Sequence, residues 1–188
     1  SRRRHTKILT CDWSSDVCSS DLVLEAGKHV YCEWPLGANT KEAEELAALA
    51  RKKKLHTMVG LQRRASPAFL YMRELIRDGY VGQVLSVNLM FMGSGVLTRT
   101  SDRTWQRDVT LGANTLTITF GHAFDALCMV VGELTEVSAI VSTQVPQWFE
   151  TDTRKYVDVT SPDNIMIQGR TEGDRKSTRL NSSHMSES

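Results

Sequence analysis

The sequence predicts an α/β fold with a parallel sheet, which changes after residue 82 to an α+β arrangement. Between residues 28 and 78, two short apolar runs alternate with two amphipathic helical patterns. This strand–helix–strand–helix order is typical of a parallel sheet. Beyond residue 82, a longer alternating run, a polar stretch and one long helical pattern replace it. Because the first unit is too small to cover both faces of a parallel sheet, we expect the chain to be an internal fragment of a larger protein.

The first unit has recognisable boundaries. Gly27 is typical of the position that follows a helix, and an apolar strand comes next. Asn39, with Glu42 three residues later, predicts a helix start of the capping-box type. Ser66 and Pro67 predict a second helix start. The elements expected are a helix end at 23–26, strands at 28–32 and 56–60, and helices at about 40–53 and 67–78.

The second unit begins near residues 80–83. We expect a strand over 84–91, where polar and apolar residues alternate, and a polar connection over 93–110. A helical pattern follows from about residue 114 to 131, and strand-like runs cover 137–141 and 165–168. We therefore interpret residues 23–80 as the end of one domain and residues 81–173 as the start of another.

The two ends of the chain are unlike its middle. One possible coding sequence of residues 174–184, read as its reverse complement from the third base, translates into residues 12–21. Agreement over ten consecutive residues is very improbable by chance, and the DNA resembles a short-read sequencing adapter. We therefore interpret residues 1–22 and 174–188 as translated adapter and exclude them from the native protein. The alternative is a pair of basic, disordered tails.

Charge and cysteine content exclude several classes of protein. The chain has 23 basic and 22 acidic residues, and without the two tails, which hold seven and five of these, its net charge is −1. A neutral surface does not support direct nucleic-acid binding. No apolar run is long enough to suggest a membrane span. Cys32 and Cys128 are the two cysteines outside the tails, and they predict isolated buried thiols, no metal site and a reducing, cytoplasmic compartment.

The first strand runs directly into a carboxylate, an indole and a proline. Ligands of open α/β sheets bind just beyond the carboxyl ends of the strands, which is the position of Glu33 and Trp34. Pro35 stiffens the turn behind them. The alternative is an ordinary strand end with an incidental Glu.

Several motifs, taken together in order, carry a family resemblance. They are Ala26–Leu36 with its Glu33-Trp34-Pro35, Gln62, Arg64–Pro67, Trp105–Asp108, Leu111–Ala113, Thr119–His122, Pro162-Asp163 and Gln168-Gly169. Residues 23–173 resemble the glucose–fructose oxidoreductase, inositol dehydrogenase and rhizopine catabolism family (Gfo/Idh/MocA). Within it, the chain is most similar to the branch of the galactose-regulon repressor, because Glu-Trp-Pro replaces the Glu-Lys-Pro motif of the family.

The resemblance implies the end of a Rossmann domain that binds NAD or NADP, followed by the start of an open-sheet domain. It also implies a sugar or polyol as the small-molecule ligand and a homo-oligomeric parent protein. The sequence contains no Gly-x-Gly-x-x-Gly phosphate-binding loop, which in the family precedes the part matched here. We therefore expect the cofactor to bind the intact parent.

The resemblance also identifies site residues and two departures. The catalytic Lys of the family corresponds to Trp34, and the Asp four residues before the catalytic His corresponds to Ile118. His122 remains as the acid/base, unless it is a buried His bonded to a backbone carbonyl. Glu33, Trp34, Pro35, Gln62 and Arg64 are expected at the cofactor. The alternatives are that Trp34 only covers the strand end and that Arg64 is a surface charge. Asp125 orients the His122 imidazole or is an exposed helix acid.

Two functions are consistent with these residues. One is an NAD(P)-dependent oxidoreductase of a sugar or polyol that uses His122. The other is a dinucleotide-binding regulator, with a protein partner, that keeps the pocket and has lost the chemistry. Family membership favours the first, and the Trp34 and Ile118 replacements favour the second.

Overall fold

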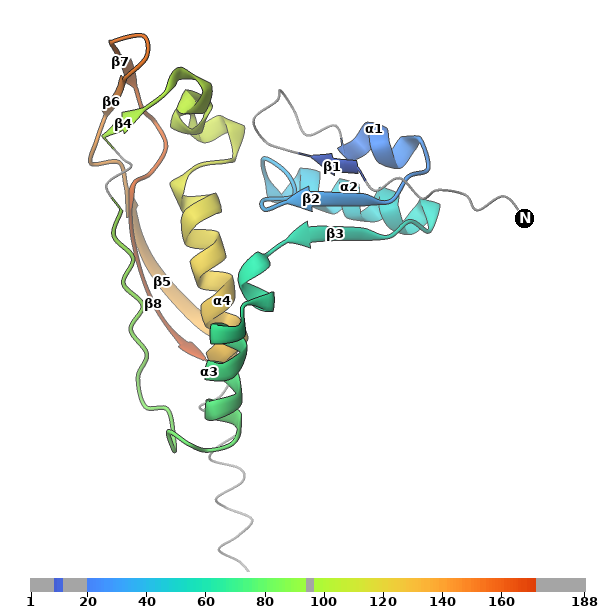
Figure 1. The fold of residues 1–188 in the computed structure, drawn as a ribbon, viewed down its shortest axis with the longest axis vertical. Coiled ribbons are helices and arrows are strands. Elements are labelled where there is room, and N and C mark those ends of the chain that lie inside the picture. The colour runs from blue at the N-terminus through green and yellow to red at the C-terminus, as the bar shows by residue number, and fades with distance from the viewer. Residues whose placement is uncertain (1–8, 12–19, 94–96, 172–188) are drawn as a thin grey trace, which may run out of the picture.

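The computed structural model describes residues 9–11, 20–93 and 97–171, and Figure 1 shows them as two parts that meet near the ends of β2 and β3. The first part is a parallel sheet in the order β1-β2-β3, formed by Leu9–Cys11, Val30–Glu33 and Thr57–Gly60. Helices α1 (Ser20–Glu25) and α2 (Thr40–Lys53) accompany it. The parallel sheet expected from the sequence is confirmed. Leu9–Cys11 and Ser20–Leu22 fall within the tail interpreted as translated adapter, and that interpretation stays a prediction.

The core of the first part lies between β2 and the two helices. Alternate residues of β2 are buried, and Val30 and Cys32 pack with Leu24 of α1 and Ala50 of α2. This alternation places Tyr31 and Glu33 on the opposite side of the strand, where they are only partly buried. One face of the sheet is therefore covered, and Glu33 belongs to the other.

The N-terminus of α2 is capped as the sequence predicts. The Asn39 side chain accepts a hydrogen bond from the Glu42 backbone N–H at 3.0 Å. The Glu42 carboxylate in turn accepts from the backbone N–H of Ala38 at 2.8 Å. These bonds fix the loop between β2 and α2, which carries Trp34 and Pro35.

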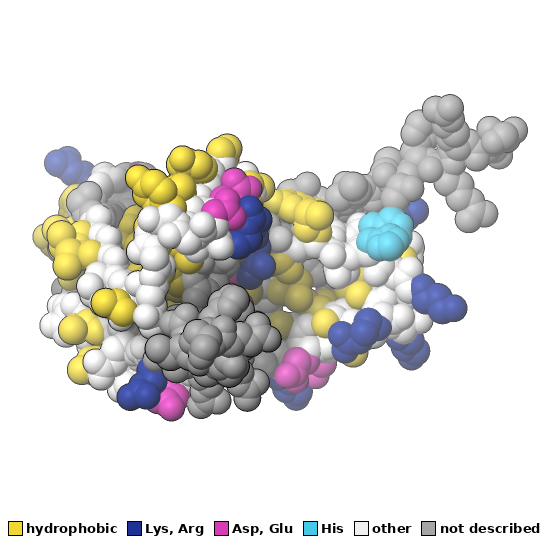
Figure 2. All heavy atoms as spheres, turned by 90° about the horizontal axis from the view of Figure 1, so that it is seen from below, with side chains coloured by type: hydrophobic (Ala, Val, Ile, Leu, Met, Phe, Trp, Pro, Cys, Tyr) yellow, Lys and Arg dark blue, Asp and Glu magenta, His cyan; other side chains and the backbone are white. Residues whose placement is uncertain are grey.

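The second part begins with a short 3-10 helix, η1 (Gln62–Ala65), and with α3 (Pro67–Arg77). The strand predicted over 84–91 is wrong, because this segment runs along the molecule without forming a ladder with another described strand (Figure 1). Its large apolar side chains stay exposed, with Leu85 at 85% and Met90 at 80%. Figure 2 shows hydrophobic side chains gathered on the surface of this larger part of the molecule.

Two small sheets complete the second part. In one, β4 (Thr98–Arg99) pairs with β6 (Gln147–Glu150) in parallel, and β6 pairs with β7 (Lys155–Asp158) in antiparallel. In the other, β5 (Leu134–Ser142) pairs with β8 (Asn164–Thr171), which confirms the two later strands expected from the sequence. The 3-10 helices η2 (Ser101–Arg107) and η3 (Val109–Leu111) follow β4. The sequence analysis did not anticipate β4, β6 or β7.

The long helix expected over 114–131 is present, but its first turns are wider than α-helical ones. A π-helix, η4 (Thr115–Phe120), leads into α4 (Gly121–Val131). The buried Asn114 side chain accepts from the backbone N–H groups of Leu116 and Thr117, and the Thr117 hydroxyl accepts from the Asn114 N–H. Across the described ranges, none of the helices has the length and apolar character needed to cross a bilayer.

Gly112 brings the two parts into direct backbone contact. It has a φ of +75°, and a Cβ built on it would lie 2.2 Å from the carbonyl oxygen of Ala38, in the loop after β2. Gly79 has a similar φ of +78°, with no atom within 4 Å of its Cβ position. Both glycines therefore have the positive φ that disfavours other residues, but only Gly112 also lies against the backbone of Ala38.

We expect Gly112→Ala to destabilise the protein more than Gly79→Ala. Gly79→Ala should cost about 1 kcal/mol, since an L-residue is strained in the left-handed region. Gly112→Ala adds a backbone clash with Ala38, so its cost should exceed about 2 kcal/mol. Denaturant unfolding of the two variants measures both values, and equal costs would contradict the close contact at Ala38.

Candidate functional site

The site lies where the carboxyl ends of β2 and β3 face the start of α4. Glu33 pairs with Gly60 in the parallel ladder, and Gln62 follows two residues later. The Gln62 side-chain amide donates to the Glu33 carboxylate, with Nε2 and Oε1 3.3 Å apart. Two residues expected at the cofactor are thus adjacent, because parallel strands end at the same edge of a sheet.

Trp34 reaches across to the second part. Its indole Nε1 donates to the backbone carbonyl oxygen of Thr117, in the π-helix, at 2.7 Å. Gly121 makes room for the ring, because a Cβ at this residue would lie 2.4 Å from Nε1. The only hydrogen-bond donor of the indole is therefore used by the protein itself.

Pro35 is buried and follows Trp34 through a cis peptide bond. It has no polar side-chain atom, so it can contribute only apolar surface to a ligand site. The stiff turn expected behind Trp34 is consistent with this position.

His122 lies in the first turn of α4, beside Gly121, and is partly buried. Its imidazole forms no hydrogen bond with another described residue, so the alternative of a His tied to a backbone carbonyl is not seen in this part of the chain. Burial lowers the pKa of His122 below its ordinary 6.5, and the positive charge of Arg63 lowers it further, against the opposing charges of Glu33 and Asp125. The neutral imidazole, which can accept a proton, is therefore the main form at pH 7.

Arg64 and Asp125 form a bidentate ion pair beside His122. The Arg64 Nε lies 2.9 Å from both carboxylate oxygens of Asp125, and Nη2 lies 2.5 Å from Oδ1. The Asp125 side chain is only 15% exposed and that of Arg64 52%. This hydrogen bonding, with the charge of Asp125, raises the pKa of Arg64. Asp125 is thus neither an exposed helix acid nor, within the described residues, bonded to the His122 imidazole.

The two residues that replace charged residues of the family, Trp34 and Ile118, bring no charged group to the site. Ile118 lies in the π-helix, one residue after the carbonyl that receives the Trp34 indole. Neither Trp34 nor Ile118 places a charge next to His122. The charges that act on the imidazole come from Arg63, Glu33 and Asp125.

Four residues of this site were missed by the sequence analysis or given no role in it: Arg63, Asn114, Thr117 and Gly121. Arg63 acts on His122 from η1, which requires the fold to be known. Asn114 precedes the long helix, and its residue type, which is common at helix N-caps, is the signal in the sequence for this role. The contact between Trp34 and Thr117 joins residues 83 apart and leaves no pattern in the sequence.

The residues present fit the nucleoside part of a dinucleotide. Glu33 offers carboxylate oxygens beyond the ends of parallel strands, with Gln62 holding one of them, and ribose hydroxyls are donors to such oxygens. The glycine-rich loop that holds the phosphates is not part of this sequence.

Comparisons with known proteins agree with this fold. Residues 20–61 match the family described as "Oxidoreductase family, NAD-binding Rossmann fold", and residues 67–179 match "Gal80p, C-terminal domain". The chain is 37% identical over 151 residues to the dehydrogenase aclE of Aspergillus oryzae, covering 78% of this chain and 41% of that protein. It is 29% identical over 151 residues to the galactose/lactose metabolism regulatory protein GAL80 of Kluyveromyces lactis, covering 76% and 33%.

A solved structure shows the same arrangement. The super-repressor mutant Gal80(S0)-[G301R] of Gal80p from Saccharomyces cerevisiae superposes with a TM-score of 0.77 at 26% identity, covering 87% of this chain and 46% of that one. The chain thus spans less than half the length of these relatives. The chain belongs to the Gfo/Idh/MocA oxidoreductase family, with a second domain of the Gal80p C-terminal type.

Proposed function

We propose that the intact protein binds NAD or NADP together with a sugar or polyol, and that it transfers hydride slowly or not at all. One observation carries this proposal: the indole N–H of Trp34 is bonded to the carbonyl oxygen of Thr117. The residue at the position of the family's catalytic Lys therefore has no charge and no remaining donor to offer a substrate oxygen.

The electrostatic consequence is large. Hydride transfer from an alcohol requires that the developing charge on the substrate oxygen be stabilised and that its proton be removed. A positioned cation or donor contributes roughly 3–4 kcal/mol to such a step. A general base such as His122 contributes about 10²–10⁴-fold in rate, a separate effect of similar size that does not replace the missing cation. Binding is retained in this arrangement, whereas most of the electrostatic help is lost.

The residues proposed for the cofactor are those at the strand ends. The nicotinamide, when bound, supplies the hydride acceptor. Glu33 and Gln62 offer acceptors and a donor for ribose hydroxyls, and Trp34 and Pro35 offer flat apolar surface behind them. Arg64, half-exposed and tied to Asp125, retains its outer face for a polar part of the ligand. These roles rest on position and chemistry.

The second candidate function is a competent sugar or polyol dehydrogenase. It is favoured by His122, whose lowered pKa leaves a neutral imidazole with no partner among the described residues. In this reading His122 accepts the alcohol proton, and a group outside this chain replaces the missing Lys. The similarity to the dehydrogenase aclE supports it.

The proposed biological setting of the parent is supported by the sequence pattern, the two isolated cysteines and the family resemblance. We propose a homo-oligomer in a reducing, cytoplasmic compartment, with native domains over residues 23–80 and 81–173. If the protein is a regulator, it acts by binding a protein partner, and direct nucleic-acid binding is not required.

We expect the intact protein to bind NAD or NADP at micromolar concentration. Whichever sugar or polyol is supplied, reduction of the cofactor should be slower than the ordinary enzyme rate of about 1–10³ s⁻¹. Trp34→Lys should raise turnover by about tenfold or more, because a cation replaces an indole N–H that is already bonded to the Thr117 carbonyl. Trp34→Phe is the matched control, since it keeps an aromatic ring, adds no charge and should not raise turnover. Calorimetry measures binding, and absorbance of the reduced cofactor across a panel of sugars and polyols measures turnover.

Ordinary turnover by the unchanged protein, abolished by His122→Ala, would reject the slow-transfer proposal and establish the dehydrogenase. Absence of cofactor binding to the intact protein would reject both functions.

His122 also predicts a pH dependence of stability. Its pKa is lowered in the folded protein, so the unfolded chain binds this proton more readily than the folded one. The free energy of unfolding should therefore fall as pH drops through the unfolded pKa near 6.5 and level off below the folded pKa. His122→Gln should flatten the curve below about pH 7, relative to the unchanged protein, in urea titrations at each pH. Identical pH profiles of the two proteins would show that folding does not lower the pKa of His122.

A further inference from the structure

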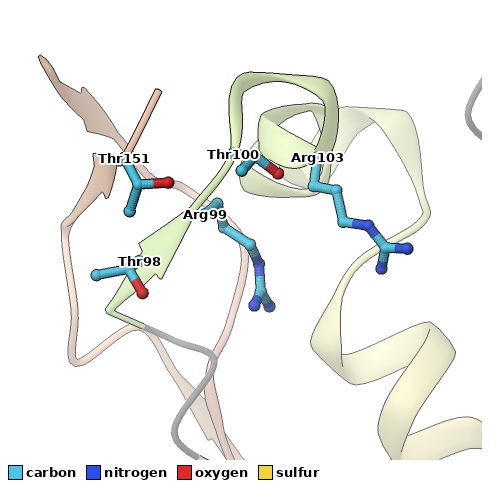
Figure 3. Close-up of a pocket in the computed structure, with 5 residues that line it drawn as sticks. All are labelled: Thr98, Arg99, Thr100, Arg103 and Thr151. Carbon is cyan, nitrogen blue, oxygen red and sulfur yellow. The ribbon is translucent and has the colours of Figure 1, made fainter. Parts of the chain in front are cut away.

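Among the residues that the structure describes, Arg99 and Arg103 have no carboxylate partner. Arg99 ends β4 and Arg103 lies in η2, and Figure 3 shows both guanidinium groups extending in the same direction from these elements. None of the ion pairs within the described residues includes either side chain.

Two carboxylates close to these arginines in the structure, those of Glu150 and Asp152, accept hydrogen bonds from other residues. Glu150 faces Arg99 in the β4–β6 ladder, but its carboxylate accepts from the Thr153 hydroxyl at 2.6 Å. Asp152 accepts from the backbone N–H of Ser101 at 2.9 Å and from its hydroxyl at 2.5 Å. In agreement, the pKa of Arg99 is lowered, first by burial and then by the positive charge of Arg103.

Arg99 is held in place by an aromatic ring. Its Cζ lies 5.0 Å from the ring centroid of Trp148, which is 1% exposed. A guanidinium stacked in this way is preorganised for a ligand.

Three buried hydrogen-bond donors in this corner of the molecule lack a partner among the described residues. Within the described ranges, the buried side-chain polar atoms that lack a partner are Arg99 Nε, Trp105 Nε1 and Trp148 Nε1. All three are donors, and all three belong to β4, η2 or β6. Buried donors are normally paired, so the protein itself leaves these three donors unsatisfied.

A hollow of about 300 Å³ adjoins the two arginines. Thr98, Thr100 and Thr151 line it together with Arg99 and Arg103. This volume is at the lower end of the range for small-molecule sites. Threonine hydroxyls both donate and accept, so they suit the hydroxyl groups of a polar ligand.

We propose that Arg99 and Arg103 bind the oxyanion of a small, hydroxyl-bearing molecule, either a phosphate ester or a carboxylate. An oxyanion neutralises the two like charges, and the planar guanidinium matches its geometry. The site is formed by β4, η2 and β6 and is separate from the edge of Glu33 and Gln62. It does not depend on the function proposed above.

Calorimetric titration of the 188-residue protein with inorganic phosphate, glucuronate and glucose tests the site. We expect one or both anions to bind and neutral glucose not to bind. Arg103→Gln should weaken anion binding by at least about tenfold, because a charge-assisted hydrogen bond is lost. Arg103 is exposed, so this change should leave the fold intact, which far-UV circular dichroism checks. Arg99→Lys, which keeps the charge, should bind better than Arg99→Gln.

Arg73→Gln is the matched control, because Arg73 is an exposed arginine on α3 without an ion pair among the described residues. It should leave anion binding unchanged. Binding of phosphate alone assigns a phosphate ester, binding of glucuronate alone assigns a carboxylate, and binding of both assigns a general oxyanion site. Failure of both anions to bind at millimolar concentration overturns the proposal, and so does binding that Arg103→Gln leaves unchanged.

Discussion

The hydrogen bond from the Trp34 indole to the Thr117 carbonyl is the contact on which the site depends. It joins the end of β2 to the π-helix that begins the long helix of the second domain. Gly121 permits the approach, because any side chain at this residue would collide with the indole. Gly112 makes a second close contact, between its own backbone and Ala38 in the same loop. The loop after β2 is therefore shaped by residues of both domains.

The ion pair of Arg64 and Asp125 is a second connection between the strand ends and the long helix. Arg64 follows β3 in η1, and Asp125 lies in α4, one turn beyond His122. His122 thus lies on the helix between the residues that meet Trp34 and the residue that meets Arg64. Its surroundings are set by two contacts whose polar groups are already satisfied, which suits a rigid binding site better than a site with charges held ready for reaction.

Local patterns predicted the local parts of this structure well. The cap at Asn39 and the start of α3 at Ser66-Pro67 depend on neighbouring residues, so the sequence was sufficient. The meeting of Glu33 and Gln62 was also within reach, because the ends of adjacent parallel strands share an edge.

Contacts between distant residues were not predictable in this way. Arg64 and Asp125 are 61 residues apart, and each alone resembles an ordinary surface charge. Alternation over 84–91 predicted a strand, yet a strand also requires a partner in register, which alternation does not reveal. A change from π- to α-helical turns has no periodicity of its own in six residues.

The π-helix has a consequence for how this site compares with others built on the same long helix. A π-turn contains one more residue than an α-turn, so it rotates everything after it by about 100° relative to an uninterrupted α-helix. In this chain that rotation lies between the buried cap at Asn114 and His122. The side of the helix on which the imidazole emerges is therefore determined by the π-helical turns of the segment 115–120. If residues 115–120 formed α-helical turns at the same length, His122 would turn away from the strand ends, whereas a single-residue deletion that restores α-helical turns would leave it on the same side.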